Sequence, residues 1–406
     1  MMVSQCLETI NVLKLSIKRN LKEKWWLKKE YQPKEYQNNE IERAMNKILQ
    51  IFDNQWVEDI LDEWLRDQRK NHLMIRQLIE KGSYPLGIFV GLGNDLIEIE
   101  SLKNSEVLIK DLKNGTKFIS TAFETEIAAE CVTRGFDVEL YPELCGKIPD
   151  LKIIFDSKIV YFEITEIHPS QQIRSLHKTL NNLFEYVNPL IPENTSIRLT
   201  PYKLISNSQF NQIRNRLKHI LEDNLSFSTS FQINDLIVEV EKENDDWGKS
   251  LYITIPSDVI DLELKRLKDK IKKKARQINE PNLGVIVVDA TNTLSSAFSA
   301  VGRRIKEGTS LAPNSTVDII LDVFEPLDKK TEHNKEIEVI NKIKNNIKEI
   351  FEQSNYSNIL AVIVIRSFKF FKKQNEAIII ENPYCEELQL LKKINELHAF
   401  SRTTNL

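Results

Sequence analysis

The chain has 406 residues, with 56 Lys and Arg against 59 Asp and Glu, a formal net charge of −3 and 41% hydrophobic residues. This composition is typical of a globular protein of two or three domains, and it excludes a global electrostatic attraction to nucleic acid. The four cysteines show no CxxC spacing, which argues against a zinc ribbon or a disulfide framework and favours a reducing cytoplasm. No apolar run approaches the roughly 20 residues of a membrane span.

Residues 1–82 are predicted to form a helical N-terminal region, because apolar residues between Glu40 and Lys81 recur three or four positions apart. The basic segment IKRNLKEKWWLKK near its start can bind phosphates and stack bases. We favour the alternative, an amphipathic helix whose tryptophans lie in the core. Gly82 to Asn114 is predicted to be a connector with one or two short strands, in which GLGN at 91–94 forms a turn.

The stretch from Phe123 to His168 carries the most informative pattern. Phe123–Thr133 has helical spacing, and Gly135 follows it as a C-terminal glycine does. A strand is predicted at Phe136–Tyr141. Two further apolar runs, 151–155 and 159–164, are joined by a short polar segment and predict a hairpin.

Two acids mark one end of this hairpin. Asp150 directly precedes its first strand, and Glu163 lies near the end of its second strand. Antiparallel pairing would bring the two carboxylates together, where they repel each other and favour a divalent cation such as Mg²⁺ or Mn²⁺. Thr165 shares a strand face with Glu163, so both side chains can point at the same site.

A third acid can approach from the preceding helix. Glu124 shares a helix face with Ile127, which is expected to pack on the sheet. Glu126 and Glu130 form an i, i+4 pair that is expected to face water. We therefore favour Glu124 over Glu126.

Pro149-Asp150 and Glu163-Ile164-Thr165, preceded by a helix with Glu124, resemble the motif of the PD-(D/E)xK nuclease superfamily. The local order is similar to that of type IV restriction nucleases, over residues 123–168 only. The resemblance implies a metal-dependent phosphodiesterase whose metal ligands are Asp150 and Glu163, with the Ile164 carbonyl as a third candidate. Glu124 and Thr165 would complete the catalytic set by holding the attacking water.

Thr165 departs from the family pattern, which has a lysine at this position. A threonine hydroxyl can hydrogen-bond a water but carries no charge. Lys152, two residues after Asp150 in the same strand, and Lys147 are the candidates for the missing cation, and the choice between them stays open. His168 is a candidate ligand or base, although a lone histidine is more often a hydrogen-bonding partner.

The second half of the chain continues an α/β pattern. Val259–Ile278 is predicted to be a strongly basic helix, and its Lys272, Lys273, Lys274 and Arg276 are candidates for contacts with a nucleic-acid backbone. A solvated face with acidic i, i+4 partners is an equal alternative. The other predicted helices are Ser170–Val187, Asn207–Leu221, which is also basic, Thr293–Glu307 and Glu332–Phe351. The other predicted strands are Thr195–Thr200, Phe231–Glu241, Leu251–Ile255, Leu283–Asp289, Ile359–Ile365 and Ala377–Ile380.

The sequence thus predicts an α/β protein with a restriction-endonuclease-like mixed sheet flanked by helices. Its parts would be the helical region 1–82, a PD-(D/E)xK-like core at 83–256 and an α/β extension at 257–406, whose continuity with the core stays open. The expected function is that of a Mg²⁺-dependent endonuclease of the cytoplasm, acting on nucleic acid, with DNA preferred over RNA, in restriction or antiphage defence. The alternative, favoured by Thr165, is an inactive nucleic-acid-binding or assembly module. Binding to a membrane is not expected, and a homodimer or a partner protein stays open.

Overall fold

The computed structural model describes the chain except for residues 1–18, 20–22, 33–35, 67–71, 73, 76–77, 79–81, 156, 193–194, 204, 206, 223–228, 243–248, 254–255, 279, 291–300, 306–320, 323–328, 354–355, 368–375, 386, 396–400 and 403–406. The chain divides into two units, and each is built from separate segments. Unit 1 comprises Met1–Glu166, Ile271–Asp289 and Phe351–Asn405, and unit 2 comprises Ile167–Lys270, Ala290–Ile350 and Leu406.

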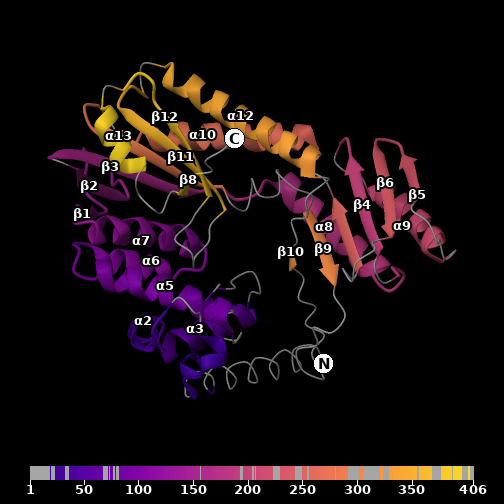
Figure 1. Ribbon diagram of the computed structural model, residues 1–406, viewed down its shortest axis with the longest axis horizontal. Helices are drawn as coiled ribbons and strands as arrows, with labels where there is room; N and C mark the ends of the chain where they lie inside the picture. Colours follow the sequence, from indigo (N-terminus) through magenta and orange to yellow (C-terminus); the bar gives the residue numbers. More distant parts are fainter. Residues whose placement is uncertain are drawn as a thin grey trace. The chain divides into compact units, whose positions relative to one another are not determined.

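A seven-stranded mixed sheet organises unit 1, in the order β1-β2-β3-β8-β11-β12-β13 (Figure 1). Its strands are β1 (Asp137–Leu140), β2 (Leu151–Phe155), β3 (Lys158–Glu166), β8 (Leu283–Asp289), β11 (Ile359–Ser367), β12 (Glu376–Glu381) and β13 (Ser401–Arg402). The three central strands β3, β8 and β11 run parallel, while β1 to β3 form an antiparallel meander. The apolar runs of β8 and β11 are buried on both faces, as expected for central parallel strands. The sheet therefore takes strands from both the predicted core at 83–256 and the predicted extension at 257–406.

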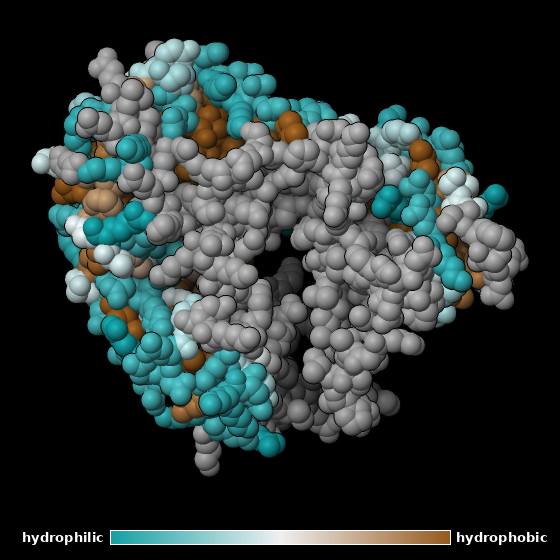
Figure 2. Space-filling view, viewed as in Figure 1, coloured by the Kyte–Doolittle hydropathy of each residue, from teal (hydrophilic) through white to brown (hydrophobic). Residues whose placement is uncertain are grey.

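The N-terminal helices pack into the same hydrophobic core as this sheet. They are α2 (Asn38–Ile51), α3 (Asn54–Arg66), α5 (Ser83–Ile99), α6 (Ser105–Leu112) and α7 (Phe118–Thr133). Trp25 and Trp26, in the short 3₁₀ helix Trp25–Leu27, are buried, so they are core residues and have no free face for stacking on bases. Part of the basic segment before them, at 17–18 and 20–22, lies outside the described residues. The outward surface over α2 and α3 is mainly hydrophilic (Figure 2).

The prediction of a strand-containing connector at 82–114 is wrong, because α5 and α6 occupy it. The helix α5 is buried almost all round, so its sequence lacks the 3.6-residue polar periodicity that identifies a surface helix. Gly93 does not form the predicted turn but allows α5 to pack closely against α2. A Cβ added there would lie 2.5 Å from the Ala44 carbonyl oxygen of α2, so only glycine lets the two helices approach this closely.

Unit 2 contains a six-stranded mixed sheet in the order β10-β9-β7-β4-β6-β5. Its strands are β4 (Thr195–Pro201), β5 (Thr229–Ile233), β6 (Leu236–Lys242), β7 (Lys249–Ile253), β9 (Val301–Ile305) and β10 (Leu321–Asp322). The helices α8 (Gln171–Val187) and α9 (Asn207–Glu222) bury their apolar stripes against one face of this sheet. The remaining helices are α10 (Ser257–Ala275), which belongs to unit 2 up to Lys270 and to unit 1 from Ile271, α12 (Lys329–Phe351), which belongs to unit 2 up to Ile350, and α13 (Leu388–Asn395) of unit 1.

Two further predictions are corrected in unit 2. The helix predicted at Thr293–Glu307 is wrong where it is described, since Val301–Ile305 is strand β9, and residues 293–300 and 306–307 lie outside the described residues. The single strand predicted at Phe231–Glu241 is a hairpin of β5 and β6, which turns at Asn234 with φ +50°. The chain is thus a mixed α/β protein, and no helix among its described residues is long and apolar enough to cross a membrane.

Candidate active site

The predicted hairpin forms, and its register brings the two acids together. Leu151 of β2 pairs with Phe162 of β3, so Asp150 lies beside Glu163 at the end of the hairpin. The Asp150 Oδ2 atom accepts a hydrogen bond of 2.6 Å from the Ile164 backbone N–H, and the Asp150 carbonyl accepts one of 2.9 Å from the Tyr141 N–H. Asp150 is therefore held on both sides by backbone groups of the neighbouring chain segments.

A lysine distant in sequence joins these two acids. The Lys274 ammonium group, in the last turn of α10, lies 2.6 Å from Glu163 Oε2 and 3.4 Å from Asp150 Oδ2. The Glu163 side chain is fully buried and the Lys274 side chain is 19% exposed, so the triad is largely shielded from water. Lys274 belongs to unit 1, which includes the chain from Ile271 to Asp289.

Packing against β8 explains why Lys274 reaches this position. Ile278 lies directly over Gly284, where an added Cβ would come within 2.5 Å of the Ile278 Cδ1 atom. The buried Asn358 donates one hydrogen bond of 3.1 Å to the Ile278 carbonyl and another of 2.8 Å to the Asn282 carbonyl. These contacts fix the segment after α10 against the sheet and hold Lys274 beside Glu163 of β3.

Glu163 has a second partner from the same segment. With its amide nitrogen turned toward Glu163, Gln277 donates to both carboxylate oxygens, with 2.9 Å to Oε1. Burial and the nearby charge of Asp150 raise the pKa of Glu163 to about 7, against the opposing effect of Lys274. Burial likewise raises the pKa of Asp150, although Lys274 and the Ile164 N–H oppose the shift. Burial lowers the pKa of Lys274, but the two carboxylates outweigh it and raise that pKa overall.

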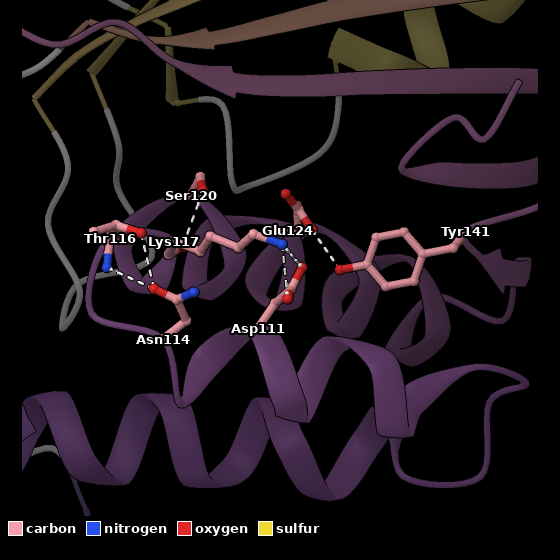
Figure 3. Close-up of polar contacts among 7 residues, drawn as sticks. All are labelled: Asp111, Asn114, Thr116, Lys117, Ser120, Glu124 and Tyr141. Atoms are coloured by element: carbon pink, nitrogen blue, oxygen red, sulfur yellow. Dashed lines mark hydrogen bonds and ion pairs between the residues drawn. The ribbon is translucent and has the colours of Figure 1, made fainter. Parts of the chain in front are cut away.

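Glu124 approaches from α7 and is 7% exposed. Figure 3 shows its carboxylate facing the Tyr141 hydroxyl, which donates a hydrogen bond of 2.8 Å to Glu124 Oε2. Burial and the charge of Asp150 raise the pKa of Glu124 well above its ordinary value. Nearby in the same view, Lys117 forms an ion pair of 2.8 Å with Asp111. Glu124 therefore belongs to the electrostatic environment of Asp150.

The expectation that Glu126 and Glu130 form a solvent-facing pair is wrong for Glu126, which is 8% exposed. Glu130 pairs instead with Arg134 at 2.9 Å. The helix α7 is buried on nearly all sides, so its acids cannot be assigned to faces from an assumption that one side meets water.

Neither lysine proposed from the sequence contacts the acids. Lys152 forms an ion pair of 3.0 Å with Glu139, across β1 and β2, so its side chain is engaged away from the pair. Lys147 donates to the Arg276 carbonyl, and its charge lowers the pKa of Glu163 only as a minor effect. His168 is exposed and belongs to unit 2.

Thr165 is buried on β3, two residues beyond Glu163. Of the four cations proposed to contact nucleic acid, Lys274 is instead committed to the acidic pair. Lys273 and Arg276 are exposed and Lys272 is half-buried, so their predicted role remains a prediction.

Among the described residues, no three His, Cys, Asp or Glu side chains are grouped closely enough to hold a metal ion. The Lys274 ammonium group contacts both Asp150 and Glu163, and the Tyr141 hydroxyl donates to Glu124. No protein-family model, curated protein or solved structure matches this chain.

Residue type and sequence distance did not distinguish Lys274 from its neighbours. It is one of three consecutive lysines, and it lies 111 positions after Glu163. Helical spacing offered one usable signal: Ile271, Ala275 and Ile278 form the buried stripe of this segment, and Lys274 lies beside that stripe.

Proposed function

We propose that unit 1 is a metal-dependent phosphodiesterase of the PD-(D/E)xK type that cleaves nucleic acid, DNA in preference to RNA. The observation that carries this proposal is the contact of the Lys274 ammonium group with both Asp150 and Glu163 in a buried site. Two carboxylates and a lysine are the chemical groups that the family motif requires. Here the lysine comes from α10 and would take the role of the motif lysine, whose position in the sequence is occupied by Thr165.

The donor set fits a hard divalent cation. Asp150, Glu163 and the Ile164 carbonyl offer only oxygen ligands, which suit Mg²⁺ or Mn²⁺. Burial raises the pKa values of Asp150, Glu163 and Glu124, and the charge of Asp150 raises the latter two further. An added positive charge would stabilise the ionised forms of these acids. When bound by Asp150 and Glu163, Mg²⁺ would act as a Lewis acid and lower the pKa of a coordinated water.

The protein's own groups account for the remaining requirements. The Lys274 ammonium group, on a stem fixed by the packing of Ile278, would donate a hydrogen bond to the phosphate and offset the charge that develops on it. The Thr165 hydroxyl, on the same strand face as Glu163, would orient the attacking water. Glu124, held by Tyr141, would accept a hydrogen bond from that water.

The second candidate is an inactive nucleic-acid-binding or assembly module. The same ion pairs favour it, because a lysine that neutralises two buried acids can serve stability alone. A role in restriction or antiphage defence follows from analogy with the family.

The test is cleavage of plasmid, linear duplex, single-stranded DNA and RNA with Mg²⁺, Mn²⁺ or EDTA. Wild type would be compared with Asp150→Asn, Glu163→Gln and the control Glu139→Gln, whose carboxylate pairs with Lys103 and Lys152 outside the site. Metal-dependent cutting that the first two substitutions abolish and the control retains is expected. Cutting that survives Glu163→Gln would refute the proposed site, and no cutting by the wild type would favour the inactive module.

A further inference from the structure

The helices α8 and α9 of unit 2 concentrate positive charge in a chain that is slightly acidic overall. Residues 167–222 contain seven basic residues (Lys and Arg) and three acidic residues (Asp and Glu). Residues 223–270 contain six basic and eleven acidic residues. The two helices bury their apolar stripes against one sheet face, so their polar sides remain available to solvent. Arg174, Lys178 and Arg216 are exposed there, and Arg214 is half-buried.

These four cations differ from other cations of unit 2 in their surroundings. Salt bridges pair Lys203 with Asp235, Arg266 with Glu263, Lys268 with Glu349 and Lys342 with Asp261. Within the described part of the chain, Arg174, Lys178, Arg214 and Arg216 take part in no salt bridge. Their charge is therefore not cancelled by a described carboxylate.

Two of the arginines are held by aromatic rings. The Arg214 guanidinium lies 4.8 Å from the centre of the Tyr186 ring, and that of Arg216 lies 5.7 Å from the centre of the Phe231 ring. A ring below the guanidinium restrains its position and leaves the outward-facing nitrogens able to donate. For Arg214 these are the terminal nitrogens, because its Nε atom is buried without a hydrogen-bond partner. A planar, pre-oriented set of donors suits the non-bridging oxygens of a phosphate.

We infer that Arg174 and Lys178 of α8 and Arg214 and Arg216 of α9, together called the α8–α9 basic surface, bind the phosphate backbone of nucleic acid. Arg214 lies on the side of α9 toward Tyr186, and Arg216 lies on the side toward Phe231. The inference rests on the proposed function and deepens it, since it assigns a substrate-binding surface to unit 2. Charge complementarity favours a polyanion. The apolar sides of α8 and α9 are buried in the core, so neither helix has a hydrophobic face to insert into a membrane.

The test is equilibrium binding of the full chain to fluorescently labelled duplex DNA, single-stranded DNA and RNA, in EDTA and over a series of salt concentrations. The variant Arg174→Ala/Lys178→Ala/Arg216→Ala removes three exposed charges. The control Lys103→Ala/Lys158→Ala/Lys342→Ala removes three charges that are paired with carboxylates. Circular dichroism would verify that both triple variants remain folded.

Each phosphate that a cation neutralises contributes about 0.9 to the slope of log K against log salt. We therefore expect the slope to decrease by roughly 2–3 in the first variant, with the control like wild type. Equal binding by the two variants would overturn the inference, as would binding of anionic lipid vesicles without binding of nucleic acid. The comparison of duplex, single strand and RNA identifies the form that is bound. Nucleic-acid binding by the wild type without cleavage would refute the proposed nuclease and support the α8–α9 basic surface. Cleavage by the wild type, with binding unchanged in the first variant, would support the nuclease and refute the surface.

Discussion

Replacement of Lys274 by methionine tests whether the lysine neutralises the buried acids. Methionine has a similar length but no charge, so it would leave Asp150 and Glu163 without this cationic partner. Removing one member of a buried ion pair costs about 3–5 kcal/mol when the remaining charge cannot be neutralised. Here protonation of Glu163 would reduce this cost, because the pKa of Glu163 is already raised to about 7.

The expected decrease in stability therefore depends on pH. Glu163 ordinarily titrates near 4.5, and its raised folded-state pKa means that the folded protein holds this proton more tightly than the unfolded chain. Its contribution to stability is present below about pH 4.5 and falls by about 3 kcal/mol as the pH rises to 7, at about 1.4 kcal/mol per unit. Without Lys274 the pKa rises further, so the fall continues to higher pH. The difference between Lys274→Met and wild type should be small near pH 5 and largest in alkaline solution.

Denaturant unfolding followed by tryptophan fluorescence measures this difference, since the buried Trp25, Trp26 and Trp56 report on unit 1. Lys273→Met is the matched control, because it removes the same group from the exposed neighbouring position. Nuclease activity should fall roughly 10²–10³-fold in Lys274→Met, the effect of removing one group that stabilises developing charge, with partial rescue in Lys274→Arg. A Lys274→Met protein as stable as Lys273→Met at alkaline pH would refute the electrostatic reasoning.

Three further predictions concern other parts of unit 1. Tyr141→Phe removes the hydrogen bond to Glu124 and should reduce the free energy of unfolding by about 1–2 kcal/mol, measured by the same denaturation; an unchanged value would show that the bond is not formed in solution. Gly93→Ala places a Cβ against the Ala44 carbonyl and should cost at least about 2 kcal/mol, and an unchanged melting temperature would contradict the packing of α2 on α5. The rate of cleavage at limiting Mg²⁺ should increase as the pH rises through about 7, where Glu163 ionises. The midpoint of the pH–rate profile should move to lower pH as Mg²⁺ approaches saturation. A profile that is flat across this range would exclude Glu163 as a ligand.

Local patterns predicted the elements around the site well because each has a local physical cause. Gly135 has φ +80° and ends α7 as expected, and β2 matches its predicted range from Leu151 to Phe155. The pairing of Asp150 with Glu163 followed from the geometry of an antiparallel hairpin, which needs no information from the rest of the chain.

The misassignments arose where burial is complete or where the partner is distant. The helix α5 has no polar side to reveal its period, and Gly93 marks a close helix contact instead of a turn. Lys274 could not be selected from the sequence because its position depends on how Ile278 packs on Gly284, a contact between a helix end and a strand. Lys152 is closer to Asp150 in the sequence, but its side chain forms an ion pair with its cross-strand neighbour Glu139.

The pairing of β3 with β8 has a consequence for synthesis of the protein. Residues 167–282 separate these adjacent central strands, so ribosomes working at about 5–20 residues per second deliver β8 on the order of ten seconds after β3. During that interval one edge of β3 has no partner strand, and an open apolar edge invites pairing with other nascent chains. During the same interval Glu163 has no ion-pair partner, because Lys274 has not yet been synthesised or packed against β3. Expression should therefore depend on chaperones that shield this strand, and fragments that end before Leu283 should aggregate.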